Sequence, residues 1–305
     1  FRSENSSKQW ATSYDFRSIN SGHIVKTELP NGNLAQAQAY VFNLRREKFK
    51  DPLVREALSM MFNFEWSNEQ LFYGLYDRVN SFWGNSNLEA TGVPKGVELT
   101  ILQNLVDKGI LDVSVLTEPA VMAPVSGLRQ LDRKNLRKAS ALLDEAGWLV
   151  NDVGMREKGG QVFTLEVLDS SPAFDRITNP MIENMKSLGI AAKLNRVDPA
   201  QEMERSRAYD FDVTTHSMRM SLEPSSGLEQ YFGTKAMDAS SRNLMGLSDP
   251  GVDALIDLVV RSENKEELND RIRALDRVLR SKRFWIPQWF KSVHTVAYYD
   301  QYEHS

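Results

Sequence analysis

The sequence predicts an α/β fold, a mixed sheet with flanking helices, and three observations support that prediction. Apolar segments alternate between strand-like and helix-like periods over residues 163–215, in the order strand, helix, strand, helix, strand. Such an order is typical of a sheet that is covered by helices. Hydrophobic residues make up 41% of the 305 residues and charged residues 26%, the balance of a soluble globular protein. No apolar run approaches the roughly 18 residues that a membrane-spanning helix needs.

The net charge and the absence of cysteine exclude several classes of function. The formal net charge is -4 and the chain shows no basic stripe, which argues against a nucleic-acid-binding protein. There is no cysteine, so disulfides, thiolate nucleophiles and cysteine zinc sites are excluded. The first residue is Phe1 rather than Met, and no signal peptide is visible. We therefore expect a cut or processed amino terminus, with any targeting information lost from this chain.

The first predicted elements are two strands and a helix. His23–Leu29 alternate between apolar and polar side chains, and Ala39–Leu44 form an almost continuous apolar segment, so both are expected to be strands. Asp51 is a predicted helix N-cap, because Pro52 follows it at the first helical position, where a missing N–H costs nothing. Apolar residues then recur at helical spacing up to Phe62.

The middle of the chain combines helices with less regular segments. A second helix is expected from near Asn68 to Gly74. Residues 75–96 are predicted to form a loop that is rich in aromatic and amide side chains, and a polar linker follows it. The next helix is expected to begin after its N-cap, Asp132, and to end at Gly147.

The remaining elements alternate strands and helices. The segment Gly154–Gly160 is typical of a hairpin turn that leads into a strand. The elements expected after it are a strand Phe163–Leu168, a helix from Ile177 that ends at Gly189, a strand Ile190–Val197, a helix capped by Asp198, a strand Asp210–Thr215, two helices near Asp249–Val260 and Lys265–Arg283, and an extended tail Trp285–Tyr299.

The segment from Ala208 to Ser225 says most about function. It begins as a strand and then places Arg219 between Met218 and Met220, where the strand should stop. A cation between two flexible apolar side chains has no evident role in the packing of a hydrophobic core. Because open α/β sheets bind ligands at the carboxyl ends of their strands, we expect ligand contact in this loop.

Three polar residues of the same segment also suit a metal ion in principle. Asp210, Asp212 and His216 would share one face of the predicted strand. The sequence contains no HExxH motif, no cysteine and no acidic calcium loop to complete such a site. Polar residues on the outward face of a strand are the more common case, so we predict no metal.

Several motifs along the chain resemble those of one protein family. Residues 51–59, Asp-Pro-Leu-Val-Arg-Glu-Ala-Leu-Ser, resemble the D-x-x-V-R-x-A-L helix of the family 5 extracellular solute-binding proteins, the oligopeptide and dipeptide receptors of bacterial ABC importers. Residues 141–148 resemble its LL-x-E-A-G-W segment, and residues 243–256 its N-x-x-G-Y-S-N-P-E-V-D-A-L-L segment. The hairpin and strand at 154–168 and the Leu-Gly-Ile turn at 188–190 match in the same order. Each motif alone is weak, and their shared order makes the resemblance specific.

The resemblance implies an architecture of two lobes that are joined by hinge strands and enclose the ligand. The context of Tyr73-Gly74 and Asn85-Ser86 and the opening residues 4–12 look most like the Yej-type branch of the family, which is associated with microcin C and oligopeptides. Residues 1–38 would be the end of the first lobe and the hinge approach, residues 39–285 the second lobe, and residues 286–305 a return strand toward the first lobe. The chain would then be a fragment that consists mainly of the second lobe.

The function implied by the resemblance is that of the substrate-binding component of an ABC importer, which is periplasmic, is no enzyme and has no cofactor. Its partners would be a peptide or peptide-like ligand and the permease subunits of the transporter. An oligosaccharide receptor of the same family is one alternative, since the loop around Trp83 suits sugar rings. A hydrolase domain is another, although no GxSxG motif, phosphate-binding glycine loop or cysteine nucleophile is present.

The candidate ligand-binding residues follow from these arguments. Arg219 can bind a carboxylate through two hydrogen bonds or stack on an aromatic ring. In the dipeptide-type receptors an aspartate of this loop pairs with the amino group of the ligand, and Met220 stands near that position, which favours a longer or modified ligand. Core packing is the alternative role for the aromatic and hinge positions. The predicted set is Tyr40, Asn43, Phe82, Trp83, Asn85, Ser86, His216, Ser217, Met218, Arg219, Met220 and Ser221.

Overall fold

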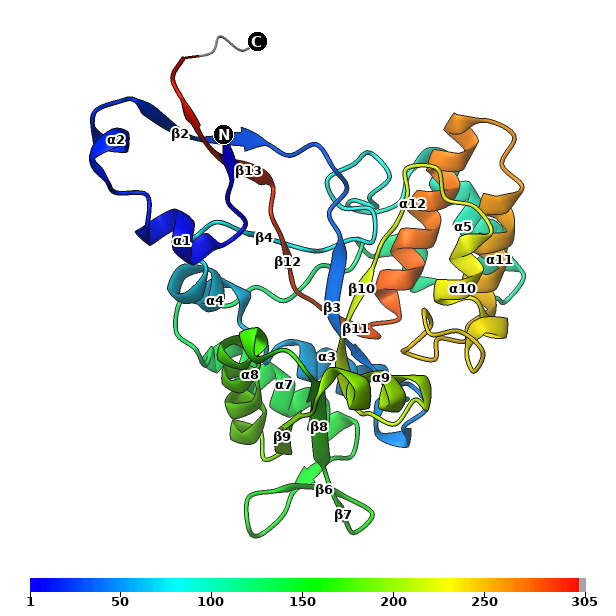
Figure 1. Cartoon of the computed structure of the whole chain (residues 1–305). Coiled ribbons are helices and arrows are strands. Elements are labelled where there is room, and N and C mark those ends of the chain that lie inside the picture. Colours follow the sequence, from blue (N-terminus) through cyan, green and yellow to red (C-terminus); the bar gives the residue numbers. More distant parts are fainter. Residues whose placement is uncertain (302–305) are drawn as a thin grey trace.

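A five-stranded mixed sheet forms the centre of the computed structural model, which describes residues 1–301 (Figure 1). The strand order is β11-β3-β10-β8-β9. Strands β8, β9 and β10 run parallel, while β3 pairs with both β10 and β11 in the antiparallel sense. The predicted mixed α/β sheet is therefore confirmed. The bounds are β3 (Ala37–Phe42), β8 (Thr164–Asp169), β9 (Ala191–Arg196), β10 (Val213–Met218) and β11 (Trp285–Pro287).

Helices cover both faces of this sheet, because its strands are apolar on both sides. Ala39 and Val41 of β3 face one hydrophobic cluster, and Tyr40 and Phe42 face the other. The first cluster packs against α5 (Gly96–Asp107), α10 (Gly227–Phe232), α11 (Pro250–Val260) and α12 (Lys265–Ser281). The second packs against α3 (Pro52–Ser59), α4 (Phe64–Leu71), α7 (Arg133–Glu145) and α8 (Asp175–Ser187).

A separate three-stranded sheet brings the two ends of the described chain together. It contains β1 (Arg2–Ser3), β13 (Val293–Tyr299) and β2 (Ile24–Pro30), with β13 in the middle. Figure 1 shows this terminal sheet and the short helices α1 (Ser7–Thr12) and α2 (Arg17–Asn20) standing apart from the central sheet. The ribbon of β4 (Asp77–Arg78) and β12 (Trp289–Phe290) lies between the two sheets. The division into residues 1–38, 39–285 and 286–305 stays a prediction.

Helix caps explain why the predicted helices begin where they do. The Asp51 carboxylate accepts the N–H of Leu53, and Pro52 occupies the first helical position of α3. Asp132 caps α7 and Asp198 caps α9 (Pro199–Arg207) in the same way. Beyond the ends of α7 and α8, Gly147 and Gly189 adopt the positive φ that ends a helix at little cost.

Several elements differ from the sequence prediction. Helix α5 occupies part of the expected loop and linker, α4 begins at Phe64 instead of near Asn68, and α10 was not predicted. Strand β10 begins at Val213 instead of Asp210 and continues to Met218, because β3 pairs with it along that whole length. The expected turn at 154–160 is partly a strand, β6 (Arg156–Lys158), between β5 (Leu149–Val150) and β7 (Gln161–Val162).

The remaining short elements are α6 (Ser114–Thr117) and the 3-10 turns η1 (Glu47–Phe49), η2 (Pro172–Phe174) and η3 (Thr234–Ala236). Within residues 1–301, no helix combines the length and the apolar character that crossing a membrane requires.

Candidate functional site

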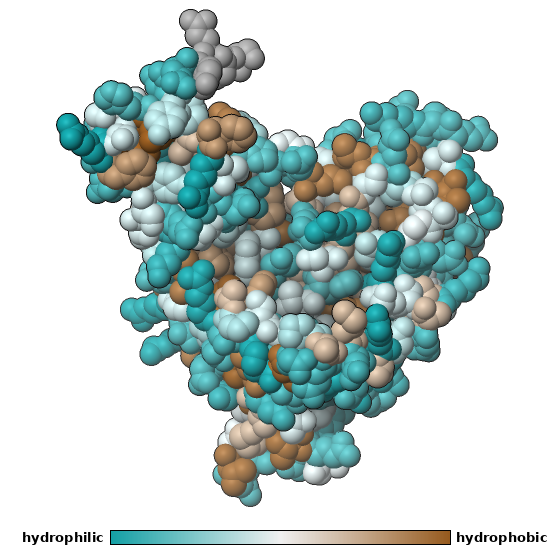
Figure 2. Space-filling view, in the orientation of Figure 1, coloured by the Kyte–Doolittle hydropathy of each residue, from teal (hydrophilic) through white to brown (hydrophobic). Residues whose placement is uncertain are grey.

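The carboxyl ends of β8, β9 and β10 meet at one edge of the central sheet, which we call the carboxyl edge. Strand β10 ends there at Met218. Figure 2 shows that this face of the molecule is hollowed between the terminal sheet and the body that carries α5, α11 and α12. An edge of this kind is the usual ligand position in open α/β sheets.

Arg219 is the exposed cation at this edge. Among the described residues it forms no hydrogen bond and no ion pair. Met218, before it, is fully buried in the core, and Met220, after it, packs partly buried against the same core cluster. Ser217 is partly buried and Ser221 is exposed. The guanidinium is thus held on a chain that is anchored by two methionines, while its own donors are free.

The loop around Trp83 lies beside this edge, but its two large aromatic rings point into the core. Phe82 stacks on Trp285 with ring centroids 4.2 Å apart, and both Phe82 and Trp83 are fully buried. The Trp83 Nε1 donates to the carbonyl of Ser221 at 3.0 Å. Trp83 therefore supports the predicted ligand-binding loop from the core side through this hydrogen bond. A direct contact between its ring and a ligand stays a prediction.

Asn85 and Ser86 complete that loop by local hydrogen bonds. The Asn85 amide donates to the carbonyls of Asn31 and Asn33 at 2.8 and 2.7 Å, in the connection between β2 and β3. Asn85 has a φ of 63°, a conformation that asparagine tolerates better than most residues. The Ser86 hydroxyl donates to the Trp83 carbonyl at 2.7 Å.

A buried polar cluster lies under the carboxyl edge, on the face of the sheet that α8 covers. The Tyr40 hydroxyl shares a hydrogen bond of 2.8 Å with the Thr178 hydroxyl, and burial raises the pKa of Tyr40 above its ordinary range. Within the described part of the chain, several buried atoms nearby have no hydrogen-bond partner, among them Oδ2 of Asp169, Oγ1 of Thr215 and Nε2 of Gln288. Buried polar atoms in natural proteins are normally satisfied, so these three invite water or a ligand group.

Sequence reasoning missed Asp169 and Gln288. Asp169 directly follows the predicted strand Phe163–Leu168, and the end of a parallel strand was the available signal. No local signal marks Gln288, because its place depends on the pairing of β11 with β3.

His216 is partly buried and already engaged. Its Nε2 lies 3.1 Å from the carbonyl of Arg242 and donates to it, since a carbonyl can only accept. Burial lowers the pKa of His216 from its ordinary value, and the Arg242 carbonyl acts in the opposite direction. This imidazole holds the 240–243 loop on β10.

Asn43 lies at the opposite end of β3, away from the carboxyl edge. Its buried amide donates to the carbonyls of Tyr209 and Phe211 at 2.8 and 3.0 Å. Asp210 and Asp212 lie near it and pair with cations of the η1 segment. The structure therefore brings Tyr40, the Trp83 loop and residues 216–221 toward one edge, and it leaves Asn43 outside. Within residues 1–301, no group of three or more His, Asp or Glu side chains is arranged to hold a metal ion.

Known proteins are similar to this chain in sequence and in fold. The family model of the bacterial extracellular solute-binding proteins, family 5 (Middle), matches residues 3–239. A protein of Sinorhizobium fredii named uncharacterized protein y4wM is 40% identical over 97% of this chain and 45% of its own length. The probable peptide-binding protein YejA of Agrobacterium fabrum is 38% identical over 98% of this chain and 49% of its own length.

A solved structure has the same fold. The oligopeptide-binding protein AppA of Bacillus subtilis, in complex with a nonapeptide, superposes with a TM-score of 0.68 at 16% identity, over 98% of this chain and 52% of AppA. The chain thus spans about half the length of the relatives that it matches. Because the family model covers most of the sequence, the chain belongs to the family 5 bacterial extracellular solute-binding proteins.

Proposed function

We propose that this chain is the ligand-binding part of the substrate-binding component of an ABC importer, and that it captures oligopeptides or peptide-like compounds. The observation that carries the proposal is Arg219, an exposed cation that has no partner within residues 1–301, at the carboxyl edge of a sheet of this family's fold. Peptides supply the complementary groups, a terminal carboxylate and a row of carbonyls. The importer's permease would be the second partner, and the periplasm the place of action.

The surroundings of Arg219 suit a ligand of variable side chains. Met220 offers polarizable apolar surface that adapts to different shapes. The family aspartate that grips a ligand amine would stand near Met220, so an amine is not expected to be the main anchor here. Oδ2 of Asp169 and Nε2 of Gln288, which have no hydrogen-bond partner in the described part of the chain, can bind polar groups of a ligand through bridging waters.

Capture would follow the closure of two lobes around the ligand. A ligand that contacts both lobes shifts the population toward the closed arrangement by as much as its affinity for the two arrangements differs. The β4–β12 ribbon and the connection between β2 and β3 are the segments between the two sheets of this chain. We propose these segments as the hinge.

A binding screen tests this proposal against its two alternatives. Isothermal titration with a nonapeptide, a tetrapeptide, a linear oligosaccharide and an activated ester would be run on this chain. We expect heat from a peptide only and no ester turnover. Binding of the oligosaccharide alone, or ester turnover, would replace the proposal by the corresponding alternative.

A further inference from the structure

The segment 219–226, which we call the ligand loop, is connected to the rest of the molecule by very few bonds. Among the described residues, the bond from Trp83 Nε1 to the Ser221 carbonyl is the hydrogen bond that joins it to a distant segment. Its other bonds are local, such as that from the Glu223 N–H to the Ser221 hydroxyl at 3.1 Å. Apart from the packing of Met220 against the core, the position of the loop that carries Arg219 therefore depends mainly on where the Trp83 indole is held.

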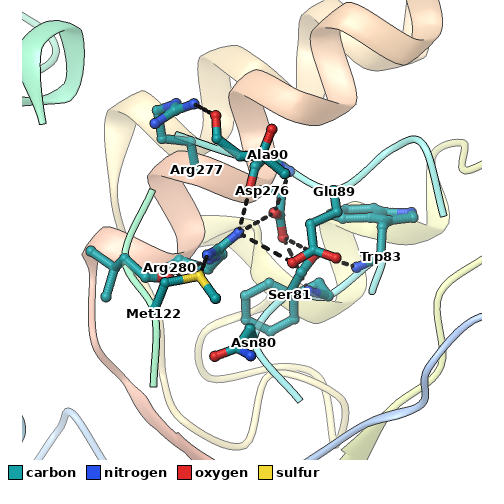
Figure 3. A network of polar contacts seen from close by, with 12 residues as sticks. Asn80, Ser81, Trp83, Glu89, Ala90, Met122, Asp276, Arg277 and Arg280 are labelled. Carbon is teal, nitrogen blue, oxygen red and sulfur yellow. Dashed lines mark hydrogen bonds and ion pairs between the residues drawn. The ribbon is translucent and has the colours of Figure 1, made fainter. Parts of the chain in front are cut away.

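Trp83 in turn is held by Asp276 of helix α12 through Ser81. The Trp83 N–H donates to the Ser81 hydroxyl at 2.9 Å, and that hydroxyl donates to Oδ1 of Asp276 at 2.9 Å. The same carboxylate accepts the N–H groups of Phe82 and Ala90, both at 3.0 Å. Figure 3 shows the carboxylate in the middle of these contacts, so one side chain holds both ends of the segment 81–90.

The Asp276 carboxylate is fully buried, and its hydrogen bonds and its ion pair offset the cost of burying it. Burial raises the pKa of Asp276, while Arg280, 3.1 Å from Oδ2, and the N–H donors act in the opposite direction. Removing one partner of such a group leaves an unsatisfied buried charge, which is costly. An asparagine in its place would turn an N–H₂ toward donors, so part of the arrangement would have to open.

We propose that Asp276 is a positioning residue of the binding site, which acts on the ligand loop through Ser81 and Trp83 and never touches the ligand. Helix α12 is the rigid element, the Trp83 indole is the link, and the Ser221 carbonyl is the point that is held. The value of this relay for ligand capture rests on the function proposed above. The relay itself is a property of the free chain and can be measured without any ligand.

The absence of cysteine makes a single spin label a clean probe of the ligand loop. Leu222, 55% exposed, would be replaced by cysteine and labelled with a nitroxide, and Val260, 48% exposed on α11, would serve as a second, separate labelling position. Each label would be placed in the wild-type chain and in S81A, W83F and D276N. The electron paramagnetic resonance line shape then reports the mobility of the labelled segment.

We expect the label at 222 to become at least about twofold more mobile in all three variants, because each breaks the relay at a different bond. The label at 260 should not change. The double variant D276N/W83F should give no greater mobility than the more mobile single variant, because both act through one pathway. Circular dichroism would confirm that the variants are folded, and S81A remains informative if D276N does not fold.

Glu98→Gln is the matched control. Glu98 is a buried acid that accepts a hydrogen bond from Arg277, also on α12, at 2.7 Å, and no bond joins it to residues 81–90 among the described contacts. Its loss should lower stability and leave the label at 222 as it is in the wild type. An unchanged label at 222 in folded S81A and W83F, or equal mobility in the Glu98→Gln control, would overturn the relay. A failed peptide titration would instead bear on the proposed function alone.

Discussion

The two ends of strand β10 are built in opposite ways. At its amino end, Asp212 accepts hydrogen bonds from Lys48 at 2.7 Å and from the Glu166 N–H at 3.0 Å, and Asp210 pairs with Arg46 at 3.0 Å. At its carboxyl end, Arg219 has no partner among the described residues. The same strand is thus tied by charges at one end and left open at the other.

This difference suggests that the amino end of β10 serves stability and that its carboxyl end serves ligand binding. Charged groups that already have partners have little left to offer a ligand. A cation without a partner is tolerated at an exposed position, but in a closed, drier cleft it would need an opposite charge or several carbonyls. We therefore propose that the carboxyl edge gains its shape mainly from apolar packing, and that Arg219 is the group there that is left free for a ligand.

The largest expected effect tests the claim that packing stabilises the carboxyl edge. Trp83→Ala should lower the free energy of unfolding by about 3–5 kcal/mol, because a fully buried indole leaves a cavity next to Phe82 and the ligand loop. Urea denaturation followed by circular dichroism measures the loss. Trp66→Ala, at a partly buried position on α4, is the control and should cost less. A loss of under about 1 kcal/mol would show that the Trp83 ring does not belong to the core.

The second expected effect tests the amino end. Asp212→Ala should lower the free energy of unfolding by about 1–3 kcal/mol, because it leaves the Glu166 N–H and the Lys48 ammonium without their acceptor. The affinity for a peptide ligand should stay unchanged, because this end lies away from the carboxyl edge. Denaturation and titration on the same preparation give both quantities. A loss of affinity with unchanged stability would invert the assignment of the two ends.

The local parts of this architecture could be predicted from the sequence. Asp51 with Pro52, and Asp132 with Gly147, mark helix starts and ends by chemistry within a few residues. Helix α5 was missed because its N-cap, Lys95, makes no side-chain cap bond and so leaves no start signal. Long-range contacts were not predictable either.

The same limit applies to the candidate site. The loop at Arg219 could be chosen as a candidate, because a cation at the end of a strand is a local pattern, and its contact with a ligand stays a prediction. The burial of Trp83 depends on α12, and the ion pairs of Asp210 and Asp212 at the amino end of β10 depend on the η1 segment. Both sets of partners are far away along the chain. Contacts between residues so far apart in the sequence leave no hydrophobic period and no capping residue, so the sequence does not predict them.

The third expected effect concerns ligand affinity at the open end. Arg219→Ala should weaken the binding of a peptide ligand by roughly 1.5–3 kcal/mol, the range for a hydrogen bond to a charged group, and change stability by less than about 0.5 kcal/mol. Arg219→Lys keeps the charge and loses the two-pronged geometry, so it should recover only part of the affinity. Amidating the carboxylate of the peptide should matter more than acetylating its amine. The reverse order in the titrations would remove Arg219 from the site.

The smallest expected effect comes from His216, which lies between the two ends of β10. Its folded pKa is lowered, mainly by burial, so the unfolded chain binds a proton more readily than the folded chain. Above its ordinary value of 6.5 the imidazole is neutral in both states and the full stability is present. As the pH falls below that value and through the folded pKa, stability is lost. His216→Gln, which can keep a donor toward the Arg242 carbonyl, should therefore lose less stability than the wild type between neutral and mildly acidic pH. Thermal melts over this range measure the two slopes. Equal slopes for the wild type and His216→Gln would mean that the imidazole is open to solvent, and that the 240–243 loop is not held on β10 through it.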